Sequence, residues 1–182
     1  MNIYEIIFEV DDYQSLLALD EEAHFTNLMD LDGKPRKDLW PASMSAEIDN
    51  LDGITPDIFS IEAGNMLLTE KSEKVIKEYL SPNYELLPVF FSGGRGVILN
   101  PLGSVDCLDD KKTIWCCDEA SGKKLFIDEL CFDKNKLPDD LIFRVKGDYF
   151  RLFCVDREDG SDNFKSIVEN NLLTGLSFEL LA

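Results

Sequence analysis

Histidine most often performs acid–base and metal chemistry near neutral pH, and this sequence contains one histidine, His24. It ends the acidic run Glu21–His24. A zinc site needs several convergent His or Cys ligands, and a general base needs a group to activate. An imidazole alone among acids therefore favours a surface residue over a metal ligand or a catalyst.

The five cysteines give little more chemistry. They are Cys107, Cys116, Cys117, Cys131 and Cys154. Their number is odd, no pair has C-x-x-C spacing, and most lie in or beside apolar, strand-like segments, which indicates reduced thiols rather than a disulfide framework. Only Cys107, ahead of Lys111 and Lys112, has basic neighbours that could activate a thiolate, so a Cys–His pair with His24 has no support from the sequence.

Two glycine-containing motifs partly resemble a phosphate-binding loop and a calcium-binding loop, but each lacks residues that such a loop requires. Gly93–Gly96 is followed by a strand and by no lysine, so it indicates a hairpin or loop and not a phosphate cradle. Asp156–Gly160 has its glycine one place early for a calcium loop, and no glutamate occupies the twelfth position. We therefore expect a protein that is not an enzyme and that holds no metal or cofactor.

The remaining candidate is a set of acids around one tryptophan in an irregular stretch, roughly residues 26–57. Its members are Asp30, Asp32, Asp38, Trp40, Asp49, Asp52 and Asp57. One interpretation is a solvated loop whose tryptophan folds down on the core. The other is a docking surface, in which a desolvated aromatic side chain gives affinity for a basic partner and the acids speed the encounter.

Charge is the strongest property of the composition. The chain of 182 residues has 36 acidic and 18 basic residues, a formal net charge of -18. Residues 1–60 contain 14 acids and 3 bases, so the first third carries most of the excess. Such a surface repels nucleic acid and anionic lipid and attracts basic proteins, although acidic surfaces also simply aid solubility. No apolar run is long enough to span a membrane, and we expect a cytoplasmic protein.

Hydrophobic patterning predicts the elements that must position these residues. A strand is expected over 3–10, a strand or extended chain over 58–68 with a turn or bulge at 63–65, a helix beginning after Thr69, and a strand over 84–91. From Val105 onward short apolar runs alternate with polar turns. The chain then ends in a buried strand, a helix capped by Ser161 or Asp162, a turn at Gly175 and a closing strand.

These elements predict an α+β fold with a mainly antiparallel sheet. It would contain two short strand–helix–strand units and the long N-terminal irregular region, in a single domain over 1–182 with a possible subdivision near residue 103. The two units, 66–89 and 153–181, suggest a weak internal pairing without any residue-level repeat.

Several motifs along the whole chain together resemble a known family. They include Asp11-Asp12-Tyr13, Pro56-Asp57, Val105-Asp106-Cys107-Leu108-Asp109 and the closing Leu173-Thr174-Gly175-Leu176-Ser177-Phe178-Glu179. In these the chain is similar to the immunity protein eleven family of bacterial polymorphic toxin systems, formerly a domain of unknown function. The motifs are structural ones: strands, a capped helix and a glycine turn.

This resemblance implies that the protein binds a cognate toxin domain and neutralises it. The charge indicates a basic toxin, and no nucleic acid or membrane as partner. Two other functions stay open. One is a small hydrolase that reverses a modification made by a toxin, and the other is a nucleic-acid mimic that inhibits many basic proteins.

Overall fold

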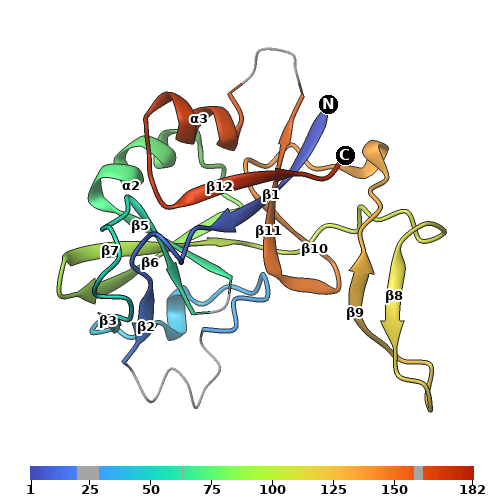
Figure 1. Cartoon of the computed structure of the whole chain (residues 1–182), viewed down its shortest axis with the longest axis horizontal. Helices are drawn as coiled ribbons and strands as arrows, with labels where there is room; N and C mark the ends of the chain where they lie inside the picture. Colours follow the sequence, from blue (N-terminus) through green and yellow to red (C-terminus); the bar gives the residue numbers. More distant parts are fainter. Residues whose placement is uncertain (20–28, 63, 158–161) are drawn as a thin grey trace.

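The computed structural model describes residues 1–19, 29–62, 64–157 and 162–182, and in this part of the chain the fold is mainly β (Figure 1). Its α-helices there, α2 (Glu70–Ile76) and α3 (Phe164–Asn170), have only seven residues each. The expected α+β class is therefore wrong. The helices were predicted where they occur, but the stretch expected to be irregular adds a strand, β3 (Ser45–Ile48), and the sheets rather than the helices form the body of the protein.

Six strands close into a small barrel. They are β2 (Leu16–Ala18), β3 (Ser45–Ile48), β4 (Ile58–Ile61), β5 (Asn65–Thr69), β6 (Tyr84–Phe91) and β7 (Gly94–Pro101), in the order β2-β3-β6-β7-β5-β4. The pairs β2–β4 and β3–β6 are parallel and the others are antiparallel. The two parallel contacts that close the barrel are short: β2 meets β4 at Leu16 and Ile61, and β3 meets β6 at Phe90 and Phe91.

Successive side chains of a barrel strand point alternately into and out of the barrel, and they belong to two different hydrophobic clusters. Leu67 and Ile98 lie opposite each other and point into the barrel, where Phe59 and Leu87 also pack. Their neighbours Met66 and Leu68 point outward, so β5 is buried on both faces. This explains why the sequence of β5 is continuously apolar instead of alternating.

The second sheet is antiparallel and joins the two ends of the chain. It has the order β10 (Phe143–Val145), β11 (Asp148–Asp156), β1 (Asn2–Phe8), β12 (Leu176–Leu180). On one of its faces Leu152 and Cys154 join the cluster that contains Met66 and Leu68, and on the other Phe153 packs with Phe143. The barrel and the second sheet thus share one core, while the single-domain expectation stays a prediction.

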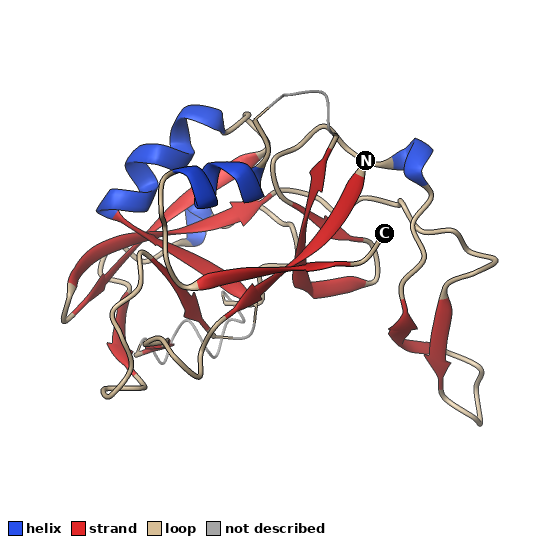
Figure 2. Ribbon diagram, turned by 45° about the horizontal axis from the view of Figure 1, so that its top comes forward, coloured by secondary structure: helices blue, strands red, loops and turns tan. Residues whose placement is uncertain are grey.

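The two predicted strand–helix–strand units have the same topology. In the first, β5 and β6 flank β7 and are connected through α2. In the second, β11 and β12 flank β1 and are connected through α3. Figure 2 shows both helices together over the sheets, and Ile76 and Phe164 enter the shared core.

The helix starts agree closely with the patterns in the sequence. Thr69 precedes α2 as predicted, although its hydroxyl donates to the Asp57 carbonyl and accepts no hydrogen bond from an amide of the helix. For α3 the cap is Asn163, one residue after the expected Asp162, and its Oδ1 accepts from the Ser166 amide at 2.9 Å. Asx side chains at this position satisfy an amide that has no partner within the helix.

Within the stretch expected to be irregular, roughly residues 26–57, the described residues 29–57 are more ordered than the sequence indicates. They contain β3 and a 3-10 helix, η1 (Lys37–Leu39), and Leu31 and Met44 are buried in the barrel core. The expected long irregular region is therefore partly wrong, because short apolar pieces between turns here close a barrel. His24 lies outside the described residues.

A two-stranded hairpin extends from this body. It consists of β8 (Ile114–Cys117) and β9 (Lys124–Glu129), which in the described part of the chain pair with each other and with no further strand. Figures 1 and 2 both show it reaching away from the remaining sheets. A third short 3-10 helix, η3 (Lys134–Lys136), follows it. Among the described residues no helix is long and apolar enough to cross a membrane.

Candidate functional site

Trp40, the expected anchor of a docking surface, is held against the barrel. Its ring packs on the barrel cluster, and its Nε1 donates to the Pro88 carbonyl at 2.8 Å. An indole with a satisfied N–H and a partly buried ring contributes mainly to packing. Of the two interpretations of this tryptophan, the structure therefore favours the packed one.

Asp57 is placed by the structure at a junction between three parts of the chain. Its carboxylate accepts from the amide and the hydroxyl of Thr174, at 3.1 and 3.2 Å, and pairs with Lys71 at 2.9 Å. Its carbonyl accepts from Thr69 and Ser72. These contacts connect the start of β4, the first turn of α2 and the turn before β12, so the carboxylate has a structural role.

The acids at 30, 32 and 38 lie among the three basic residues of the N-terminal third, Lys34, Arg36 and Lys37. Asp32 forms ion pairs with Lys34 and Arg36. Although its partial burial favours the protonated form, the hydrogen bond and charge of Lys34 lower the pKa of Asp32. Asp30 and Asp38 are exposed, but this segment as a whole is electrically balanced.

Asp49 and Asp52 belong to a different surface, formed by two loops far apart in sequence. The loop over residues 9–14 connects β1 to β2, and the loop over residues 49–55 connects β3 to β4. The amide of Ile54 donates to the Asp12 carbonyl at 3.0 Å, and the amide of Gln14 donates to the Ile54 carbonyl at 2.9 Å. We call residues 9–14 and 49–55 the paired-loop surface.

Local hydrogen bonds shape each of these loops. The Tyr13 amide donates to the Glu9 carbonyl at 3.0 Å, which turns the chain after β1. The Gly53 amide donates to the Asn50 carbonyl at 3.3 Å, so Leu51 and Asp52 occupy the corner of a β-turn. A Cβ at Gly53 would lie 2.8 Å from the backbone of Tyr13 and Gln14, so only glycine allows the loops to approach this closely.

The paired-loop surface is acidic throughout and has no neutralising base. Its acids are Glu9, Asp11, Asp12, Asp49 and Asp52, and neither loop contains a lysine or an arginine. None of these carboxylates forms an ion pair with any residue in the described part of the chain. Uncompensated charge of one sign produces a local field that attracts a basic partner.

The same two loops also present apolar side chains to solvent. Leu51 is 76% exposed and Ile54 is 65% exposed, and Val10 is exposed as well. Apolar groups within a charged surface are typical of interfaces, in which a dehydrated centre is surrounded by a polar rim. Sequence reasoning found Asp49 and Asp52 but missed Leu51 and Ile54 as the apolar component, and it missed the second loop because the pairing depends on the closed barrel.

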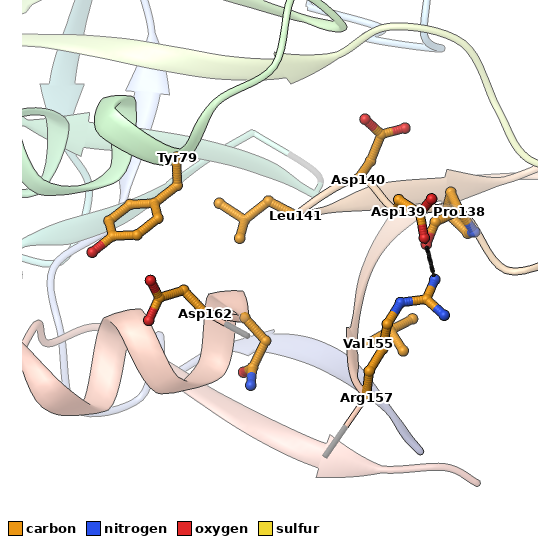
Figure 3. A pocket seen from close by; sticks show the side chains of 9 residues that line it. Tyr79, Pro138, Asp139, Asp140, Leu141, Val155, Arg157 and Asp162 are labelled. Atoms are coloured by element: carbon orange, nitrogen blue, oxygen red, sulfur yellow. Dashed lines mark hydrogen bonds and ion pairs between the residues drawn. The ribbon is translucent and has the colours of Figure 1, made fainter. Parts of the chain in front are cut away.

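The structure also contains a small crevice between η2 (Lys77–Tyr79), the start of α3 and the segment over 138–141 (Figure 3). Its volume is about 150 Å³. Tyr79 and Asp162 lie on one side, and on the other Arg157 pairs with Asp139 at 2.9 Å. The arginine also donates to the Pro138 carbonyl at 2.7 Å. Its guanidinium group is therefore already paired with residues that line the crevice.

Two of the cysteines and one tyrosine are held by burial in their neutral forms. Burial raises the pKa of Cys107 to about 11 and that of Cys154 to about 12, which keeps both as unreactive thiols. Burial likewise raises the pKa of Tyr84, whose hydroxyl donates to the Ile142 carbonyl at 2.8 Å. No cluster of three or more metal-ligating side chains occurs in residues 1–19, 29–62, 64–157 and 162–182.

Comparison of the sequence with protein-family models gives no match, and comparison with curated proteins gives none either. The resemblance to immunity proteins therefore stays a prediction from the motifs. The site must be argued from its own geometry, and the paired-loop surface is where unbalanced charge and exposed apolar groups coincide.

Proposed function

We propose that this protein acts by binding a basic protein through the paired-loop surface, and that the partner is the toxin domain to which it confers immunity. The observation that carries the proposal is the coincidence of five carboxylates with no ion pair to any described residue and the exposed side chains of Leu51 and Ile54. The toxin and the immunity role come from the family resemblance, and the basic partner comes from the charge.

Charge and apolar contact would act at different stages of binding. Long-range attraction to the carboxylates speeds the encounter and is weakened by salt. Once the proteins touch, burial of Leu51 and Ile54 slows dissociation. An interface of standard size buries about 1,600 Å² in total, which is more than two loops provide, so neighbouring surface would also take part.

A protein partner fits this surface better than nucleic acid or lipid. Phosphate groups require basic side chains that displace counterions, and the two loops contain none. Anionic membranes would be repelled for the same reason. A basic toxin that acts on nucleic acid would have a site that binds phosphate groups. The carboxylates of the paired-loop surface could fill that site in place of phosphates.

The test first looks beside this gene for a large secreted protein with a variable C-terminal domain, and uses that domain as the binding probe. The absence of such a gene would count against the immunity role. Binding of the wild type is compared with that of a variant in which Asp11, Asp12, Asp49 and Asp52 are changed to Asn. A matched control changes four exposed acids elsewhere, Glu70, Glu78, Asp110 and Glu179, to Gln or Asn. Both variants lose the same charge, so only the position of the charge differs between them.

We expect the paired-loop variant to associate at least about tenfold more slowly than the control at low salt, and the wild-type rate to fall as salt is raised. Leu51→Ser should mainly accelerate dissociation. Equal rates for the two neutralised variants, or a wild-type rate that salt does not change, would contradict the proposed surface. Protection from the toxin that requires His24 or a cysteine while binding is unaffected would favour a hydrolase instead, and inhibition of unrelated nucleases would favour a mimic.

A further inference from the structure

The β8–β9 hairpin has unpaired edges and an exposed apolar face that the proposed toxin contact does not use. Ile114 and Glu129 lie opposite each other on one face with Cys116 and Phe126, whereas Trp115 and Ile127 share the other face. Ile127 is buried and Trp115 packs against the core beneath the second sheet, so the face with Phe126 points away from the body. Phe126 is 57% exposed and Leu125 is 55% exposed.

A hairpin of this kind is incomplete as a structural unit. Two strands alone are marginally stable in water, and among the described residues each strand here leaves one edge of amide and carbonyl groups without a neighbouring strand. Lys124 lies over the Trp115 ring at 4.3 Å, which protects the inner face of the hairpin. The outer face and the edge of β9 have no such cover.

The sequence of β9 complements itself when it runs antiparallel to a second copy. Around Phe126 it reads Lys123-Lys124-Leu125-Phe126-Ile127-Asp128-Glu129. Against β8, β9 is shifted in register at Leu125 and at Asp128, so these two residues fall outside the regular pairing. A twofold axis through Phe126 then places Phe126 opposite Phe126 of the second copy, and Lys123, which precedes β9, opposite Glu129. Opposite charges and apolar groups that face each other across strands are the pairs that stabilise a sheet.

The charge of this segment does not oppose a contact between two copies. Residues 111–131 contain four lysines and four acids, so they are neutral in a chain whose net charge is -18. Two copies that meet here therefore bring no net charge of one sign together. Figure 1 places β2 and β3, which lead into the paired loops, at the opposite end of the long axis from the hairpin, so both contacts can form at once.

We propose that two copies of this chain associate through β9, which pairs antiparallel with β9 of the other copy and joins two hairpins into one four-stranded sheet. The contact is isologous, since the same strand serves both subunits. It is small, so we expect a reversible dimer with a dissociation constant of roughly 1–100 µM.

Charge reversal at the outermost pair tests both the contact and its register. Lys123 and Glu129 are exposed, and neither forms an ion pair within the described chain, so Lys123→Glu and Glu129→Lys disturb little inside one molecule. Association is measured by sedimentation equilibrium at low salt under reducing conditions, because Cys117 is exposed. Circular dichroism of each variant confirms folding.

We expect the wild type to dimerise and each single reversal to weaken the dimer about tenfold or more, because every dimer contains the pair twice. An equal mixture of the two variants should associate again, since both pairs in the mixed dimer then join opposite charges, and the double variant should dimerise alone for the same reason. A wild type that stays monomeric to several hundred micromolar overturns the proposal, as do single reversals that leave the dimer unchanged or a mixture that does not associate.

Discussion

At the scale of single residues, an acidic side chain can stabilise the fold or remain available for a partner. Asp57 and Asp49 are both in the stretch where the sequence predicts a docking surface. Asp57 accepts two hydrogen bonds from Thr174 and pairs with Lys71, whereas Asp49 is exposed and has no ion pair with a described residue. The two carboxylates should therefore respond differently to removal.

Asp57→Ala should lower the free energy of unfolding by about 2 kcal/mol, because it leaves the amide of Thr174 without its acceptor in a partly buried turn. Asp49→Ala serves as the control and should change stability by less than about 0.5 kcal/mol. Urea unfolding measures both. If Asp57→Ala is as stable as the control and instead weakens binding of the toxin domain, its assignment to the fold is wrong.

The sequence predicted the types of these residues better than their roles. An excess of acids in the first third follows from composition alone, but the distinction between Asp57 and Asp49 depends on Thr174, more than a hundred positions away. Likewise, the turn at Leu51 and Asp52 can be predicted from Asp-Gly, but its pairing with the loop at Asp12 cannot. Long-range contacts of this kind carry no local signal.

At the scale of elements, the closing turn before β12 connects the two sheets. Gly175 has a φ of +103°, and a Cβ there would clash with the carbonyl oxygen of Ile58, which begins β4. The amides of Ile58 and Glu9 donate to the carbonyls of Thr174 and Gly175. The turn thus lies against the barrel and against the end of β1 at once.

Gly175→Ala should destabilise the protein by about 3 kcal/mol or more, since it adds a backbone clash to an unfavourable φ. Gly103→Ala is the matched control: its φ is +79°, but a Cβ there meets nothing within 4 Å. Its cost should be about 1 kcal/mol, from the backbone conformation alone. If thermal unfolding shows that Gly175→Ala and Gly103→Ala lose the same amount of stability, the packing of this turn against β4 contributes nothing.

Elements with strong periodicity or clear caps were predicted well, and those without were not. The helix after Thr69, the strand over 84–91 and the final helix–turn–strand unit are confirmed. β3 was missed because its four residues lie between turns, and its burial is created by β2 and β6 on either side. The α+β class was wrong for the same reason, since barrel closure depends on such short strands.

At the scale of the whole molecule, the net charge of -18 opposes folding, because carboxylates that are brought together repel each other. A few acids are compensated locally: Lys34 lowers the pKa of Asp32 despite partial burial, so its contribution to stability is present above the unfolded pKa and is lost as the pH falls through the folded one. The paired-loop surface has no such compensation. Its charge should therefore reduce stability in exchange for binding.

Changing Asp11, Asp12, Asp49 and Asp52 to Asn should for this reason raise the melting temperature at low salt, by about 2–6 °C. The gain should shrink between about 10 and 150 mM salt, where the screening length falls from about 30 to about 8 Å. The variant neutralised at Glu70, Glu78, Asp110 and Glu179 should gain less, because those four acids belong to separate elements. If the paired-loop variant melts at a lower temperature than the wild type, these acids stabilise the fold. The idea that they destabilise the protein and serve binding instead would then be wrong.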